Sequence, residues 1–118
     1  ELVSEGSYRA ALEEYTEAKL LEMFILGKSI KGVEVPGADE DTFLGGLFDL
    51  TGELVRYATL AATEKKRDEV NRAYECFQSI AGEIISMNIT GNLRSKYDQM
   101  KQSLRRMEEI KYDLSLRE

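Results

Sequence analysis

Four carboxylates, arranged as two pairs, are the residues of this sequence whose types and spacing could do chemistry. Glu14 and Glu17 are three residues apart, and Asp49 and Glu53 are four apart. On an α-helix, either spacing places both members of a pair on one face, about one turn apart. Two like charges held side by side are costly unless a cation or a hydrogen-bond network neutralises them, so each pair is a candidate metal ligand set.

The residue types narrow the choice of metal. The chain contains no His, which excludes most zinc sites and the Glu-x-x-His di-iron pattern. Oxygen ligands alone select hard cations such as Mg²⁺ or Mn²⁺, and these ions activate water and stabilise charge on a phosphate. Because the net charge is −6, such a cation would also supply the positive charge needed to handle an acidic substrate.

A helix predicted over about 7–27, which Gly27 should cap, carries the first pair. At about 100° per residue, both glutamates fall on one stripe of an otherwise apolar character. The members of this stripe are Val3, Ala10, Glu14, Glu17, Leu21 and Phe24. Acids that interrupt an apolar stripe indicate a site, although pairs at this spacing are also abundant on solvated faces, where they pair with Lys or Arg.

A second helix, predicted over about 40–63 with Asp39 or Asp41 as its N-cap, carries the other pair. Asp49, Glu53 and Arg56 lie opposite an apolar side, and three glycines flank the acidic face: Gly45, Gly46 and Gly52. Each glycine costs a helix about 1 kcal/mol relative to alanine, and close approach of another backbone or a ligand usually explains the choice. We therefore expect the first helix to pack on this glycine-lined face and bring the four carboxylates together.

Basic residues near the second pair have two interpretations. Arg56 follows Glu53 by three residues, so it could contact a phosphate or neutralise the acid, and the second role is favoured. The cluster from Lys65 to Arg67 could touch RNA, but it is more typical of a solvated helix start. The lone Cys76 cannot form an internal disulfide, which favours the cytoplasm.

The elements that must position these residues indicate an all-α fold, an antiparallel bundle of about four helices in a single domain over 1–118. After an irregular connector at 28–38, the second helix is followed by helices at about 65–88 and 92–116, separated by a turn at 90–92. The expected core of the last two helices is Val70, Ala73, Phe77, Ile80, Ile84, Met87, Leu93, Tyr97, Met100, Leu104, Met107 and Leu114. No stretch approaches the ~18 consecutive apolar residues of a membrane span, so no membrane partner is expected.

At this point the residues resemble a known family. The segment Phe43–Arg56 resembles the signature helix of the translin/Trax family, and Glu14–Ala18 resembles the Glu-Tyr-x-Glu-Ala segment of Trax. Tyr97–Asp98 and the run 108–117 are similar to the C-terminal helix of translin. The likeness covers almost the whole chain in the family's order. Family members carry further N-terminal helices, so we expect that this chain is a fragment or has lost its natural N-terminus.

The resemblance implies both an activity and an assembly. Trax is the catalytic subunit of a Mg²⁺-dependent endoribonuclease, translin is its RNA- and DNA-binding partner, and the family forms hollow octamers. The Trax acids map onto Glu14, Glu17, Asp49 and Glu53, all of which are present. The resemblance therefore implies a subunit that cleaves single-stranded RNA through metal-activated water, as a homo-oligomer or with a translin-like partner chain.

Two other functions remain open. A non-catalytic subunit for nucleic-acid binding or assembly would bind RNA without metal and without cutting it. An all-α nucleoside triphosphate pyrophosphohydrolase also uses Glu-x-x-Glu on one helix, but its second pair is usually Glu-x-x-Asp. This chain has Asp49 and Glu53 four residues apart instead.

Overall fold

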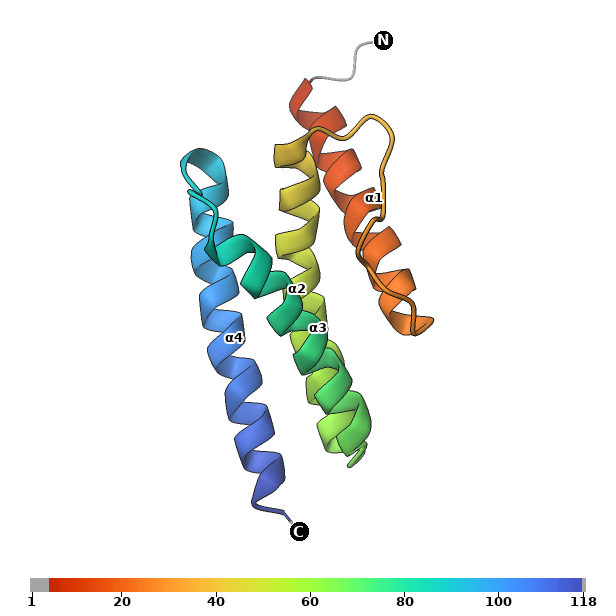
Figure 1. Ribbon diagram of the computed structural model, residues 1–118, viewed down its shortest axis with the longest axis vertical. Helices are drawn as coiled ribbons and strands as arrows, with labels where there is room; N and C mark the ends of the chain where they lie inside the picture. The colour runs from red at the N-terminus through yellow and green to blue at the C-terminus, as the bar shows by residue number, and fades with distance from the viewer. Residues whose placement is uncertain (1–4, 118) are drawn as a thin grey trace. The chain divides into compact units, whose positions relative to one another are not determined.

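The computed structural model describes residues 5–117, and every regular element in that range is helical. The elements are α1 (Glu5–Ile25), α2 (Glu40–Thr63), α3 (Arg67–Ile85), a 3₁₀ turn η1 (Gly91–Leu93) and α4 (Arg94–Ser115) (Figure 1). The predicted all-α fold with four helices is confirmed, with ends that differ from the predicted ones by up to three residues. No helix in the described range is long and apolar enough to cross a membrane.

The chain divides into two compact units whose boundary falls inside α2. The first unit, Glu1–Leu50, contains α1, the connector and the first half of α2. The second unit, Thr51–Glu118, contains the rest of α2 together with α3 and α4. Each unit is described by itself below.

In the first unit, local signals set the ends of the helices. Gly27 has φ 75°, and the backbone N–H groups of Gly27 and Lys28 donate to the carbonyls of Phe24 and Met23. This is the pattern of a helix ended by a left-handed glycine, so the predicted cap at Gly27 is confirmed. At the start of α2, Asp39 Oδ1 accepts from the Thr42 backbone N–H at 2.7 Å, which confirms Asp39 as the N-cap.

The Asp39 cap is also sensitive to pH. Hydrogen bonds from the Thr42 side chain and backbone hold the pKa of the Asp39 carboxyl below its ordinary value, because they stabilise the ionised form. The contribution of this cap to stability is therefore present above that ordinary value and is lost as the pH falls through the lowered pKa.

In the second unit, the core is a continuous set of apolar side chains from three helices. Phe77, Met100 and Met107 are among its largest fully buried members. Of the predicted core, Tyr97 and Leu104 are only half-buried. Met87 is 40% exposed because α3 ends two residues earlier, so its assignment to the core was wrong. Buried residues that the prediction missed are Ala81 and Ile110, which continue the same stripes.

A polar network joins α2 to α3 beside this core. The Tyr57 hydroxyl donates to Glu69 Oε1 at 2.5 Å, and Arg72 donates to the same oxygen through Nε and Nη2 at 3.2 and 3.1 Å. Arg72 Nη2 also donates to the Tyr57 hydroxyl at 3.3 Å, with its guanidinium 5.9 Å from the ring centroid. The hydrogen bond from Tyr57, and then that from Arg72, hold the pKa of Glu69 below its ordinary value.

We expect Tyr57→Phe to destabilise the protein by about 0.5 kcal/mol at pH 7, the low end for a hydrogen bond because the network is partly exposed. The lowered pKa of Glu69 determines whether the free energy of unfolding rises or falls with pH. The network stabilises the fold above the ordinary Glu69 value of 4.5 and loses that effect as the pH falls through the folded-state pKa. Urea unfolding at pH 7 and pH 3 should therefore show a smaller difference between variant and wild type at pH 3.

Tyr74→Phe is the matched control for this prediction. The Tyr74 hydroxyl lies on the same helix as Glu69 but accepts an exposed hydrogen bond from the Gln78 amide at 2.7 Å. Its removal should have an effect that does not change with pH. A Tyr57→Phe difference of equal size at both pH values would contradict the role assigned to ionised Glu69.

Candidate carboxylate site

Within the first unit, α1 approaches α2 closely at two glycines. A Cβ atom added to Gly46 would lie 2.6 Å from Thr16 Cβ and 2.9 Å from the backbone oxygen of Glu13. A Cβ added to Gly45 would collide with the Glu13 carboxylate. The predicted close approach at the glycine-lined face of α2 is confirmed at these two positions. At Gly52 no such approach is found, since an added Cβ would meet none of the described atoms within 4 Å.

The buried stripe of α1 differs from the one predicted. Its buried members are Thr16, Leu20 and Phe24, spaced four residues apart. Glu14 and Ala10 are exposed, Glu17 and Leu21 are half-buried, and Val3 lies outside the described residues. The prediction missed the stripe because Thr16 counts as polar. Its hydroxyl donates to the Leu12 carbonyl at 2.7 Å, which allows it to be buried without an unsatisfied hydrogen bond.

The α1 acid nearest to Gly45 is Glu13, which sequence reasoning did not single out. The Glu13 side chain is only 18% exposed, and its carboxylate pairs with Arg9 at 3.9 Å. Arg9 also pairs with Asp41 at 3.8 Å, so one arginine links α1 to the first turn of α2. Arg9 and Glu13 are four residues apart in the sequence, and this spacing, which is typical of an ion pair on one helix face, was the signal that could have identified Glu13. Glu13 therefore has a structural role in orienting the two helices.

On α2, Asp49 and Glu53 lie one turn apart, and both are half-buried. Glu53 pairs with Arg56 Nε at 3.6 Å, with side-chain exposures of 33% for the acid and 81% for the arginine. Of the two interpretations of Arg56, the ion pair with Glu53 is the one present here. An arginine that is exposed to this degree is held weakly, since exposed pairs contribute little to stability.

The four predicted metal ligands are divided between the two units. Glu14, Glu17 and Asp49 belong to the first unit, and Glu53 belongs to the second. Among residues 5–117, no three or more His, Cys, Asp or Glu side chains form a group that could hold a metal ion. Glu14, Glu17 and Asp49 therefore do not form one ligand set in this conformation. The donor chemistry still fits Mg²⁺, which is usually bound through one or two carboxylates, with water and substrate phosphates completing its shell.

The basic cluster after α2 has a structural role. Lys66 Nζ pairs with Glu64 at 3.0 Å, and the hydrogen bond that Lys66 donates to this carboxylate raises the pKa of Lys66. Arg67 Nη2 donates to the Leu114 carbonyl at 3.2 Å and to that of Arg117 at 3.4 Å, which ties the start of α3 to the end of α4. These contacts agree with the prediction of a helix start rather than an RNA contact.

Comparison with known proteins gives a single finding. The family comparison matches residues 5–118 to the Translin family, a range that includes all four helices and both carboxylate pairs. No curated protein and no solved structure matches the chain. Because the family match spans nearly the whole sequence, the chain belongs to the Translin family.

Proposed function

We propose that this chain is a subunit of a Mg²⁺-dependent endoribonuclease that cleaves single-stranded RNA, with Glu14, Glu17, Asp49 and Glu53 as its metal-binding carboxylates. Membership of the Translin family supports a role in nucleic-acid binding or assembly. The observation that carries the catalytic proposal is the presence of two carboxylate pairs on the two helices that pack at Gly45 and Gly46. Mn²⁺ would serve the same oxygen ligands.

The chain's own residues have defined tasks in this proposal. Bound Mg²⁺ would supply activation of water and stabilisation of charge on the scissile phosphate. Arg56 pairs with Glu53, and a cation bound at Glu53 would take over the neutralisation of this acid. Because the Arg56 side chain is 81% exposed, it could then turn towards a substrate phosphate and hold it through its planar fork of donors.

The partners follow from the same proposal. Single-stranded RNA is the substrate, and single-stranded DNA is a related ligand. The chain would act in the cytoplasm, either as a homo-oligomer such as an octamer or together with a translin-like partner chain. The experiment is cleavage of end-labelled single-stranded RNA with Mg²⁺, with Mn²⁺ and with EDTA, with a nucleoside triphosphate tested in parallel. Metal-dependent cutting of RNA is expected, whereas hydrolysis of the free nucleotide alone would indicate a pyrophosphohydrolase.

A second candidate is a non-catalytic nucleic-acid-binding or assembly subunit. The observation in its favour is the match to the Translin family over residues 5–118, which by itself supports nucleic-acid binding and assembly. It predicts that the protein retains labelled RNA equally well with Mg²⁺ and with EDTA, and that the RNA stays intact. The same assay therefore separates the two functions.

A further inference from the structure

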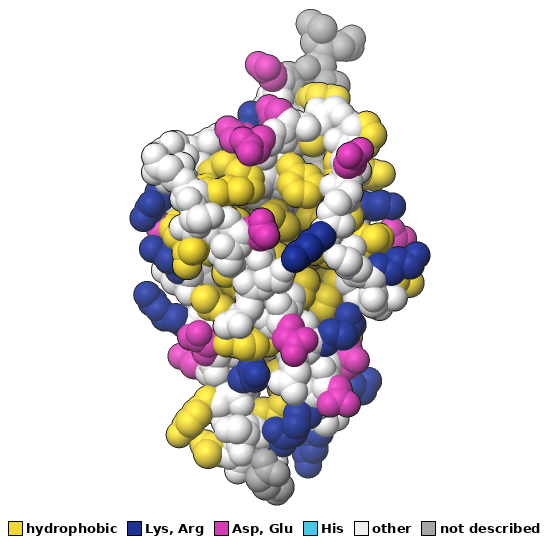
Figure 2. Space-filling view, in the orientation of Figure 1, with side chains coloured by type: hydrophobic (Ala, Val, Ile, Leu, Met, Phe, Trp, Pro, Cys, Tyr) yellow, Lys and Arg dark blue, Asp and Glu magenta, His cyan; other side chains and the backbone are white. Residues whose placement is uncertain are grey.

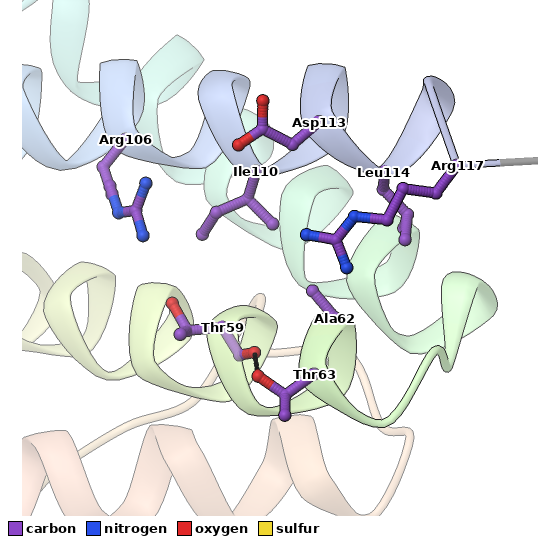
Figure 3. A pocket seen from close by; sticks show the side chains of 8 residues that line it. All are labelled: Thr59, Ala62, Thr63, Arg106, Ile110, Asp113, Leu114 and Arg117. Carbon is purple, nitrogen blue, oxygen red and sulfur yellow. Dashed lines mark hydrogen bonds between the residues drawn. The ribbon is translucent and has the colours of Figure 1, made fainter.

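The second unit contains a pocket of about 140 Å³ between the last turns of α2 and the second half of α4 (Figure 3). This is close to the roughly 150 Å³ of a protein cavity that accommodates benzene, so the pocket has room for a small ligand group. Its lining is mixed, with Ile110 and Leu114 beside several polar residues. The described residues that line it are Thr59, Ala62, Thr63, Arg106, Ile110, Asp113, Leu114 and Arg117.

Two arginines dominate the chemistry of the pocket. Figure 3 shows Arg106 and Arg117 reaching from the α4 side towards α2, on either side of Ile110. Arg106 is half exposed and keeps only a 3.5 Å contact with Glu109. Arg117 makes no ion pair within 4 Å in the part of the chain that the structure describes. Asp113 is the one acid among the described residues that line the pocket, so their side chains carry a net charge of +1.

On the α2 side, the pocket presents two hydroxyl groups. Thr59 donates to the Val55 carbonyl at 2.8 Å. Thr63 donates to the Thr59 carbonyl at 3.0 Å, which is the dashed line in Figure 3. A hydroxyl can rotate and exchange such a bond for one to a ligand. The C-terminal ends of α2 and α4, which carry partial negative charge, lie nearby. The carbonyls of Ala61 and Ala62 on α2, and those of Asp113 and Leu114 on α4, accept from backbone N–H groups.

The charge of the surrounding helix also favours an anion. Residues 94–117 contain seven basic and four acidic side chains, in a chain whose net charge is −6. Figure 2 shows basic and acidic side chains interspersed over one face of the molecule, so no broad basic surface is visible there. The positive charge that favours an anion is therefore local, in the pair of guanidinium groups beside the pocket. The forked donors of arginine match phosphate oxygens in particular.

We propose that this pocket binds a phosphate group of the nucleic acid. The inference rests on nucleic-acid binding in the proposed function but not on metal-dependent cleavage. Arg106 and Arg117 hold the phosphate oxygens, and the Thr59 and Thr63 hydroxyls complete its hydrogen bonds from α2.

The test combines two measurements, both made with EDTA so that cleavage does not interfere. Amide NMR spectra of the wild type are recorded as inorganic phosphate is added, and binding of a single-stranded oligouridylate is measured over a range of salt concentrations. Saturable shifts are expected at the pocket residues. In the double variant Arg106→Gln/Arg117→Gln, the slope of log K against log salt should become shallower by about 0.7 for each phosphate that the protein no longer neutralises.

Arg105→Gln is the matched control, since Arg105 neighbours Arg106 on α4 but does not line the pocket. It removes one positive charge from the same helix and should leave the phosphate-induced shifts unchanged. RNA binding with no phosphate-induced shifts, and equal slopes for the double variant and the control, would overturn the pocket and leave the proposed function standing. Pocket shifts with phosphate in a protein that binds no RNA would overturn the assignment to nucleic acid and identify a site for free phosphate.

Discussion

Glu17→Gln and Asp49→Asn should each reduce Mg²⁺-dependent RNA cleavage by about a hundredfold or more, since even residues that only support metal ligands cost roughly 10- to 100-fold. Each substitution keeps the shape of the side chain and removes the charge that a hard cation requires. Glu14→Gln and Glu53→Gln should behave in the same way. Glu14 is exposed and the other three carboxylates are half-buried, so none of the four substitutions places an amide in a fully buried position.

Glu22→Gln is the control for these variants. Glu22 lies on α1, is 62% exposed and pairs with Lys19 at 3.8 Å, so its removal changes the net charge by the same amount away from both pairs. Cleavage rates are measured at several Mg²⁺ concentrations, with thermal unfolding as a check on the fold. Full activity in all four variants, together with complete loss in EDTA, would show that the metal is held by other residues.

The features that sequence predicted well are those set by local interactions. The caps at Gly27 and Asp39 depend on residues within one turn, and both appear as predicted. The buried stripe of α3 follows from apolar spacing within a single helix, and it extends correctly from Val70 to Ile84. Met87 lay on the same spacing but beyond the end of the helix, where periodicity no longer applies.

The features that depend on which helix faces meet were predicted less well. The contact face of α1 includes Thr16 and the ion-paired Glu13, neither of which is apolar. The spacing of apolar residues alone therefore predicts the contact face nearer to Glu14 than it is. Gly52 has the same composition signal as Gly46, but no described atom lies within 4 Å of a Cβ added there, because close packing is a property of two helices rather than one. The pocket at Arg106 and Arg117 was missed for a related reason. The two arginines lie about three turns apart along the chain, and only the three-dimensional fold shows that they share a cavity.

The glycines of α2 allow the contact between α1 and α2 to be tested directly. Gly46→Ala places a methyl group 2.6 Å from Thr16 Cβ and 2.9 Å from a backbone oxygen, neither of which can move without shifting α1. Overpacking of this kind costs about 1–3 kcal/mol, and the better helix propensity of alanine returns about 1 kcal/mol. We therefore expect a net decrease in stability of up to about 2 kcal/mol. Gly52→Ala meets open space and should instead stabilise the protein by up to about 1 kcal/mol.

Gly45→Ala completes the series, because the three atoms nearest to its new methyl group all belong to the Glu13 side chain, which can rotate away at a smaller cost. Chemical denaturation should therefore rank the variants, from least to most stable, as Gly46→Ala, Gly45→Ala and Gly52→Ala. RNA cleavage should be slowest in Gly46→Ala and fastest in Gly52→Ala. The proposed function needs both carboxylate pairs, and Gly46 sets how closely α1 approaches α2. If Gly46→Ala were as stable as Gly52→Ala, the close contact at Thr16 would be wrong. If it were unstable but cleaved RNA at the wild-type rate in its folded fraction, the carboxylates of α1 would have no part in the reaction.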